Sequence, residues 1–253
     1  MRKIKVIALT TYRELIREKF FLVIVFVAVF LIALSLLLGE LSFDEAQKIL
    51  ADIGLTAVQI SSMGLALFAG SYLLSREIEK QTCLLMLSRP ISRTEFLLGK
   101  FGGIVLLISL LNLTLPWALL TLLNRWELAG NMAKIVLSIW LEALVVLALV
   151  FMFSVFLRPV LAVLVGVVIF LCGSWLEDMS FFAKRSHDAF FTVASDIAKW
   201  SLPNFYRFNW KNYFFLEKGI ESKEVFQLLL HYIPWIAIFL ILAIAIFRRK
   251  DIV

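Results

Sequence analysis

Charged residues are scarce in this sequence: Asp, Glu, Lys and Arg make up 17% of its 253 residues, whereas hydrophobic residues make up 62%. A soluble domain has roughly half of its residues apolar and about a quarter charged. The charged residues here are too few to cover an apolar core of this size, which excludes a water-soluble globular domain. Most of the chain is therefore expected to lie in lipid.

Cysteine and histidine are rare as well, with two residues of each. Cys83 falls in a predicted loop and Cys172 in a predicted span, so neither a disulfide nor a zinc site is expected. The sequence contains no His-Glu-x-x-His, Cys-x-x-Cys or Gly-x-Ser-x-Gly pattern, and no Gly-x-x-x-x-Gly-Lys-Ser/Thr loop for a nucleotide. We therefore expect no metal, no cofactor and no catalysis in this chain.

Long hydrophobic runs recur along the chain. Residues 20–38 are nineteen uncharged residues, which is enough helix to cross a hydrocarbon core about 30 Å thick. We interpret this run as an uncleaved first span rather than a signal peptide, because no small-x-small cleavage site precedes Gly39. The chain is predicted to be an all-α, polytopic helical membrane protein. Its six expected spans are residues 20–38, 53–75, 97–123, 132–157, 160–176 and 228–247.

Lys and Arg gather in alternate connections between these spans. Residues 1–19, 76–96 and 248–253, together with Lys100 and Arg158, hold fifteen Lys and Arg and six Asp and Glu. The short connections on the other side hold three Lys and Arg. Since cationic flanks stay in the cytoplasm, both termini are predicted to be cytoplasmic. The net charge of +6 reports this orientation, and no nucleic-acid partner is expected.

The residues ahead of the first span form an amphipathic pattern. Apolar side chains recur there at three- and four-residue steps, at Ile4, Ile7, Ala8, Tyr12, Leu15 and Ile16. This spacing predicts that residues 1–19 contain a helix lying in the headgroup layer, where its Lys and Arg meet anionic lipid. A plain cytoplasmic extension of the first span is the alternative.

The connection 76–96 contains the most specific local signals. Residues 76–87 lack Gly and Pro and predict a helix of about three turns, which Pro90 ends. Ser92 is expected to cap the next helix, while the Glu95 side chain reaches back to the cap amide. Capping of this kind predicts a rigid cytoplasmic knuckle between two spans.

The same stretch resembles the cytoplasmic signature of type-2 ABC transporter permeases. That signature runs through an acidic pair, Gly-Thr, a Leu-rich stretch, Ser-x-Pro-Ile-Ser-Arg, an acidic residue and Leu-Gly-Lys. Gln81 stands in place of the usual glycine and Cys83 in place of the usual leucine. Weaker likeness includes Ser154 to Arg158 and Leu202-Pro203-Asn204. The matching residues are Glu77, Glu79, Thr82, Leu84, Leu85, Ser88, Pro90, Ile91, Ser92, Arg93, Glu95, Gly99 and Lys100.

The resemblance implies that the loop 76–96 houses a coupling helix that docks in a separate cytoplasmic ATPase, with Met86 beside the matching residues of the loop. ATP and Mg would be bound by that partner. The resemblance also implies an exporter of the bacterial inner membrane, in which two permease subunits, a homodimer or a heterodimer with a sister permease, pair with two ATPases.

Glu142 is an ionisable residue inside a predicted span, and Asn112 lies at comparable depth in another and is its expected hydrogen-bond partner. An ionisable group at such depth is a candidate for a transport pathway, with interhelical hydrogen bonding as the alternative. Gly99 and Gly103 predict a close-packing helix face at the base of the third span.

Two further interpretations stay open at this point. The segment 177–227 is rich in aromatic residues, which predicts short helices on the outer membrane surface, or else a small folded cap over the spans. A secondary transporter or channel without an ATPase is the alternative function, and Glu142 and Pro116 speak for it. A membrane-embedded enzyme would need facing acidic or histidine clusters, and none is evident.

Overall fold

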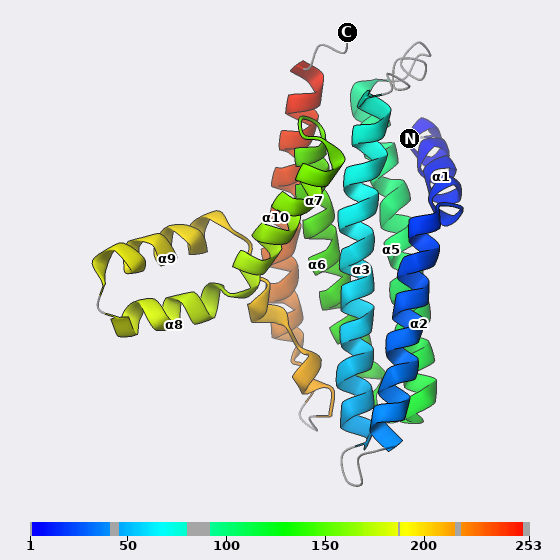
Figure 1. Ribbon diagram of the computed structural model, residues 1–253, viewed down its shortest axis with the longest axis vertical. Coiled ribbons are helices and arrows are strands. Elements are labelled where there is room, and N and C mark those ends of the chain that lie inside the picture. Colours follow the sequence, from blue (N-terminus) through cyan, green and yellow to red (C-terminus); the bar gives the residue numbers. More distant parts are fainter. Residues whose placement is uncertain (1, 41–45, 80–91, 187, 216–218, 250–253) are drawn as a thin grey trace.

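The computed structural model describes residues 2–40, 46–79, 92–186, 188–215 and 219–249, and within them all regular structure is helical (Figure 1). This confirms the predicted all-α membrane fold. The long helices are α2 (Lys19–Glu40), α3 (Ala46–Glu79), α5 (Arg93–Leu123), α6 (Ala129–Ser154) and α10 (Ser222–Arg249). The shorter elements are α1 (Arg2–Ile16), α7 (Pro159–Ser174), α8 (Leu176–Ser186), α9 (Ala189–Ser201) and the 3-10 turns η1 (Trp126–Leu128), η2 (Tyr206–Phe208) and η3 (Lys211–Tyr213).

The five long helices are each long and apolar enough to cross a membrane. Helix α7, which coincides with the predicted fifth span, has 16 residues and covers only about 24 Å at 1.5 Å per residue. It reaches the required length only together with α8, across a bend of 57°. The described residues therefore hold a sixth candidate span only if α7 and α8 count together, as a broken span or a re-entrant loop.

The long helices run side by side, with both chain termini toward the same end of the bundle (Figure 1). We call this the terminal end and the opposite one the distal end. Helices α3 and α6 lie inside the bundle, whereas α2 and α10 lie on its outside: 78% of the apolar window of α6 is buried, against 22% for α2 and 17% for α10. The outer helices therefore present their apolar side chains to lipid.

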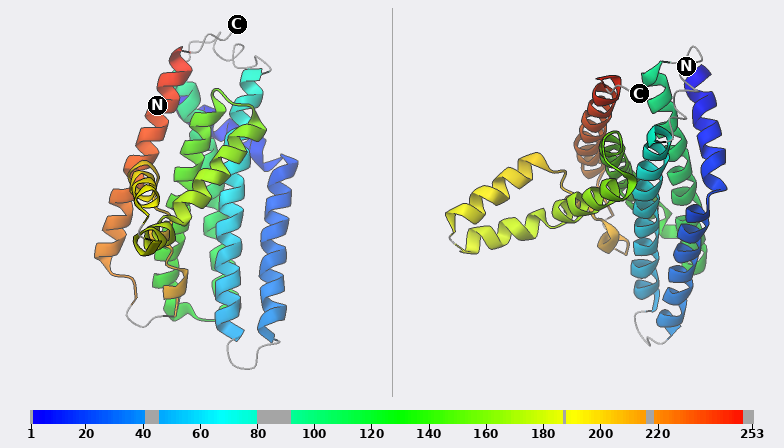
Figure 2. Two further views of the ribbon diagram at one scale, coloured as in Figure 1. Left: turned by 60° about the vertical axis from the view of Figure 1, so that its left-hand side comes forward. Right: turned by 45° about the horizontal axis from the view of Figure 1, so that its top comes forward.

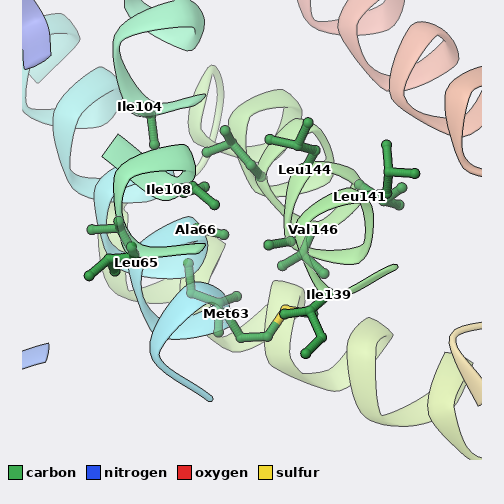
Figure 3. Close-up of a cluster of buried hydrophobic side chains, with 14 of the residues drawn as sticks. Met63, Leu65, Ala66, Ile104, Ile108, Ile139, Leu141, Leu144 and Val146 are labelled. Atoms are coloured by element: carbon green, nitrogen blue, oxygen red, sulfur yellow. The ribbon is translucent and has the colours of Figure 1, made fainter. Parts of the chain in front are cut away.

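Helix α6 is buried along most of its length, and the polar side chains that it carries inside the bundle, Ser138, Glu142 and Ser154, are buried with it. Its side chains interdigitate with those of α3 and α5 in the centre of the bundle. Figure 3 shows Met63, Leu65 and Ala66 of α3, Ile104 and Ile108 of α5, and Ile139, Leu141, Leu144 and Val146 of α6 in this cluster.

Small residues let α7 and α3 come close to α6. A Cβ atom added at Gly166 of α7 would lie 2.5 Å from Val150 Cγ2, and one added at Gly70 of α3 would lie 3.0 Å from Leu147 Cδ1. Only glycine fits the first of these positions without a shift of its neighbours. Close helix approach of this kind supplies the van der Waals packing that holds helices together in lipid.

The aromatic-rich segment 177–227 divides into two parts. Helices α8 and α9 form a hairpin that projects sideways from the bundle (Figures 1 and 2), and we call it the arm. Residues 202–215 and 219–221, which we call the cap, fold back onto the distal half of α6. The segment thus contains both short helices and a folded part packed on the spans, and the place of the helices on the outer membrane surface stays a prediction. The aromatic side chains buried in the cap are Phe205, Phe208, Trp210 and Phe214.

Hydrogen bonds hold the cap in place on two spans. Ser138 of α6 donates to the Phe208 carbonyl at 2.6 Å, and Lys134 donates to the Ile220 carbonyl at 2.5 Å. The Phe205 amide donates to the carbonyl of Gly173, where an added Cβ would lie 2.6 Å from the Phe205 ring. The residues Leu202-Pro203-Asn204 therefore lead into a segment that is packed against the end of α7.

Candidate functional site

The candidate coupling residues fall partly outside the described residues. Glu77 and Glu79 belong to the last turn of α3, and Ser92, Arg93 and Glu95 surround the start of α5. The other six, which are Thr82, Leu84, Leu85, Met86, Ser88 and Pro90, lie outside the described residues. The structure therefore shows what flanks the loop on both sides.

The start of α5 is capped in the predicted way. The Glu95 amide donates to Ser92 Oγ at 3.2 Å, and the Ser92 amide donates to Glu95 Oε2 at 2.9 Å. Together these two bonds form a capping box, which satisfies two amides that the helix leaves without partners. The predicted role of both residues in the helix start is confirmed.

The same helix start is tied to the end of α10. The Arg93 guanidinium donates to the carbonyl oxygens of Phe247 and Arg248 at 3.2 and 3.1 Å, and Arg248 donates to Thr94 Oγ1 at 3.0 Å. Beside them the rings of Phe96 and Phe247 stack 6.2 Å apart. The last carbonyls of a helix have no partner within it. The Arg93 guanidinium supplies that partner for α10, and its positive charge interacts favourably with the negative end of the helix dipole.

The end of α3 is tied to the turn between α6 and α7. Ser75 Oγ, which is buried, donates to the carbonyls of Ser154 and Leu157 at 3.1 and 3.2 Å. In return, Ser154 Oγ donates to the carbonyl of Gly70 at 3.2 Å. The Ser-x-x-x-Arg stretch thus starts with a residue that joins α6 to α3.

Gly99 and Gly103 form a close-packing face, as predicted, and the helix that packs on it is α1. A Cβ atom added at Gly99 would lie 2.7 Å from Ile7 Cβ, and one added at Gly103 would lie 2.6 Å from Thr11 Cβ. The apolar side of α1, including buried Ile7 and Leu15, is thus covered by the bundle rather than by lipid. Its position in the headgroup layer stays a prediction.

Two ion pairs at the terminal end join α1 to α5 and the break before α2 to α3. The Lys100 side chain is 2% exposed and its Nζ lies 3.6 Å from a carboxylate oxygen of Glu14. An Arg76 guanidinium nitrogen lies 3.5 Å from a carboxylate oxygen of Glu18, at the break between α1 and α2. Loss of Glu14 would be the more costly of the two changes, because it would take the carboxylate away from a buried ammonium.

A second polar site lies at mid-height in the bundle, around buried Glu142. Gln59 Nε2 of α3 donates to both carboxylate oxygens of Glu142, at 3.1 and 2.9 Å. Lys211 of the cap donates from its Nζ to Gln59 Oε1 at 2.6 Å and approaches Thr56 Oγ1 at 3.4 Å. A chain of polar contacts therefore leads from the centre of α6 to the cap.

Burial lowers the pKa of Lys211, and the carboxylates of Glu142 and Asp52 oppose that shift. The cation sits in this partly buried place because two carboxylates and an amide oxygen face it.

The hydrogen bond expected between Glu142 and Asn112 is replaced by two others. Asn112 Nδ2 donates to Ser62 Oγ at 2.8 Å and to the Ile108 carbonyl at 3.0 Å, both within the described residues. The expected pairing was wrong because both side chains point to α3, where Gln59 meets one and Ser62 the other. The bond between Gln59 and Glu142 joins α3 to α6, and the bond between Asn112 and Ser62 joins α5 to α3.

The sequence was compared with models of known protein families. The family model described as "ABC-2 family transporter protein" matches residues 6–252. The chain belongs to this family. A search of curated proteins finds no match. As an ABC-2 permease the chain is the transmembrane subunit of an ABC transporter, and the resemblance of residues 76–103 to type-2 permeases is confirmed.

Two residues of the permease that matter at the Glu142 site were missed by sequence reasoning. Gln59 is a long amide side chain inside a predicted span, and an amide in lipid needs an interhelical partner, so this signal was present. Lys211 is one of several cations among the aromatic residues of the cap, and nothing in its neighbourhood singles it out.

Proposed function

We propose that this permease couples ATP hydrolysis in a separate cytoplasmic ATPase to export across the bacterial inner membrane, and that the ATPase docks on the loop 76–96 at the terminal end. ATP and Mg belong to that partner. Both termini are then cytoplasmic, in agreement with the excess of Lys and Arg around this end of the chain.

The observation that carries the proposal is the way both flanks of this loop are fastened. On one side Ser75 holds the end of α3 to the α6–α7 turn, and on the other Arg93 holds the start of α5 to the end of α10. Lys100, two turns further along α5, is paired with α1. A force applied to the loop would therefore move several helices together.

The length of α3 supports the same assignment. Its 34 residues cover about 51 Å, which is well beyond a hydrocarbon core of about 30 Å. The last turn of α3, which contains Glu77 and Glu79, would then stand outside the membrane.

The assembly that we propose contains two permease subunits and two ATPases. Each permease supplies one set of spans, and the two ATPases meet at the terminal end of the spans when ATP is bound. The homodimer is the simplest form, because one gene product then provides both docking loops.

Leu85→Asp with Met86→Asp tests the docking site in the co-expressed complex. We expect the ATPase to be lost from the purified complex, because two buried charges would oppose an apolar contact. The matched control is Val6→Asp with Leu9→Asp, which puts the same charges on exposed apolar positions of α1 at the same end. That complex should keep its ATPase.

Retention of a fully stimulated ATPase by the Leu85 and Met86 variant would contradict the docking site. Solute flux through the purified permease alone, in vesicles without ATPase, would instead favour the secondary transporter or channel.

A further inference from the structure

A cavity of about 1050 Å³ opens between α1, α2 and α3 near the terminal end. One part of its lining is charged and comes from the last turns of α1 and the break before α2. The other part is aromatic and comes from Phe20 of α2 and from Phe68 and Tyr72 of α3. The cavity is therefore amphiphilic, with its charged part beside the first residue of a membrane span.

The charged part carries an excess of positive charge. Its two carboxylates are already paired, Glu14 with Lys100 and Glu18 with Arg76. Three cations remain, and their side chains make no hydrogen bond or ion pair with any other described residue. These cations are Arg13, Arg17 and Lys19. An anion entering the cavity would meet all three without competing against a carboxylate that lacks a cation.

The aromatic part faces the lipid side. Phe68 and Tyr72 are 50% and 43% exposed although they belong to a helix that is mostly buried. The Phe20 and Tyr72 rings meet edge to face, 6.5 Å apart, across α2 and α3. Phe68 lies two helical turns, about 12 Å, from Arg76 along α3, so the apolar wall continues from the charged part toward the middle of the span.

The height of the charged part in the bundle matches a lipid headgroup. Lys19 is the first residue of α2, and the window that follows has a mean hydropathy of 3.3. The boundary between headgroups and acyl chains must therefore lie close to Lys19. Guanidinium groups there are suited to phosphate, because their donors match two phosphate oxygens at once.

We infer that this cavity is a binding site for one anionic phospholipid. Arg13, Arg17 and Lys19 hold the phosphate and the acidic headgroup, and an acyl chain lies along Phe68 and Tyr72. The aromatic wall and the membrane boundary favour a lipid over a free phosphate. This inference does not depend on the proposed ATPase coupling.

Native mass spectrometry of the full-length permease tests the site. The protein is released from detergent with equal amounts of phosphatidylglycerol and phosphatidylcholine, and the retained lipids are counted. We expect one phosphatidylglycerol per chain to be retained in preference. Arg13→Gln with Arg17→Gln should reduce that preference about twenty-five-fold, since each cation near a membrane surface contributes about a fivefold factor.

The matched control removes the same charge from the arm, with Lys184→Gln and Arg185→Gln, and should keep the preference. Arg13→Lys with Arg17→Lys keeps the charge and should keep most of it, which separates binding from misfolding. Equal losses in the arm variant, or no loss in the Arg-to-Gln variant, would overturn the site. Displacement of the lipid by millimolar inorganic phosphate would show a phosphate site and overturn the lipid assignment.

Discussion

The Gln59 side chain of α3 donates two hydrogen bonds to the carboxylate of Glu142 on α6, and at the same time accepts one from Lys211 of the cap. One amide thus joins two central helices to a segment outside the spans. A carboxylate in the middle of a bundle needs such donors, because without them its burial is very costly.

Gln59→Leu is expected to lower the free energy of unfolding of the purified permease by about 1–3 kcal/mol, because it leaves the Glu142 carboxylate buried and without its donor. Unfolding is followed by denaturant titration in detergent. Thr56→Val is the control, since within the described part of the chain that hydroxyl makes just one polar contact, at 3.4 Å from Lys211 Nζ. The double variant Gln59→Leu with Glu142→Leu should recover stability, and a further loss there would contradict this account.

Gly103→Ala should loosen α1 from α5. The new methyl group would lie 2.7 Å from the backbone oxygen of Ala8, and overpacking of this kind costs about 1–3 kcal/mol. Hydrogen exchange of residues 4–16 is expected to become faster. Gly102→Ala is the matched control on the same helix, because its methyl group would lie 3.6 Å from Ala8 Cβ, an ordinary contact. Equal exchange in both variants would rule out the close approach.

Ser75→Ala should weaken the link between α3 and the α6–α7 turn at a cost of about 1 kcal/mol, because one hydroxyl bonds two carbonyls there. If the loop 76–96 transmits force, ATPase stimulation by the permease should fall as well. Ser71→Ala serves as the comparison, since among the described residues Ser71 bonds just the Phe68 carbonyl of its own helix. The prediction fails if the two alanine variants are equally stable and equally stimulating.

Trp200 in the arm is expected to contact lipid. It is 88% exposed and Phe190 on the same helix is 83% exposed, and rings of this kind prefer the membrane interface. In vesicles with brominated lipid, Trp200→Phe should remove a large part of the quenched tryptophan fluorescence. Trp210→Phe removes a ring that is buried in the cap and should leave the quenched part unchanged. Similar losses for the two variants would place the arm away from lipid.

Contacts between candidate residues close together in the chain could be predicted from the sequence. Contacts that join helices far apart in the chain could not. The capping box of Ser92 and Glu95 spans three residues, so a local pattern was enough to predict it. The partner of Glu142 depends on how α3 is rotated about its axis, and sequence reasoning chose Asn112 instead of Gln59. Gly103 predicted that another helix packs closely on α5, but only the folded structure showed that this helix is α1.

Hydrophobic runs and the charge pattern were enough to predict a helical membrane protein, since lipid excludes unpaired backbone groups and charged flanks cannot cross it readily. The folded chain was needed to show that α7 is too short to span alone, that the aromatic segment divides into arm and cap, and that Lys211 reaches Gln59. These features depend on side-chain packing between residues far apart in the chain, where many pairings satisfy the same hydrophobic pattern and shape complementarity selects one.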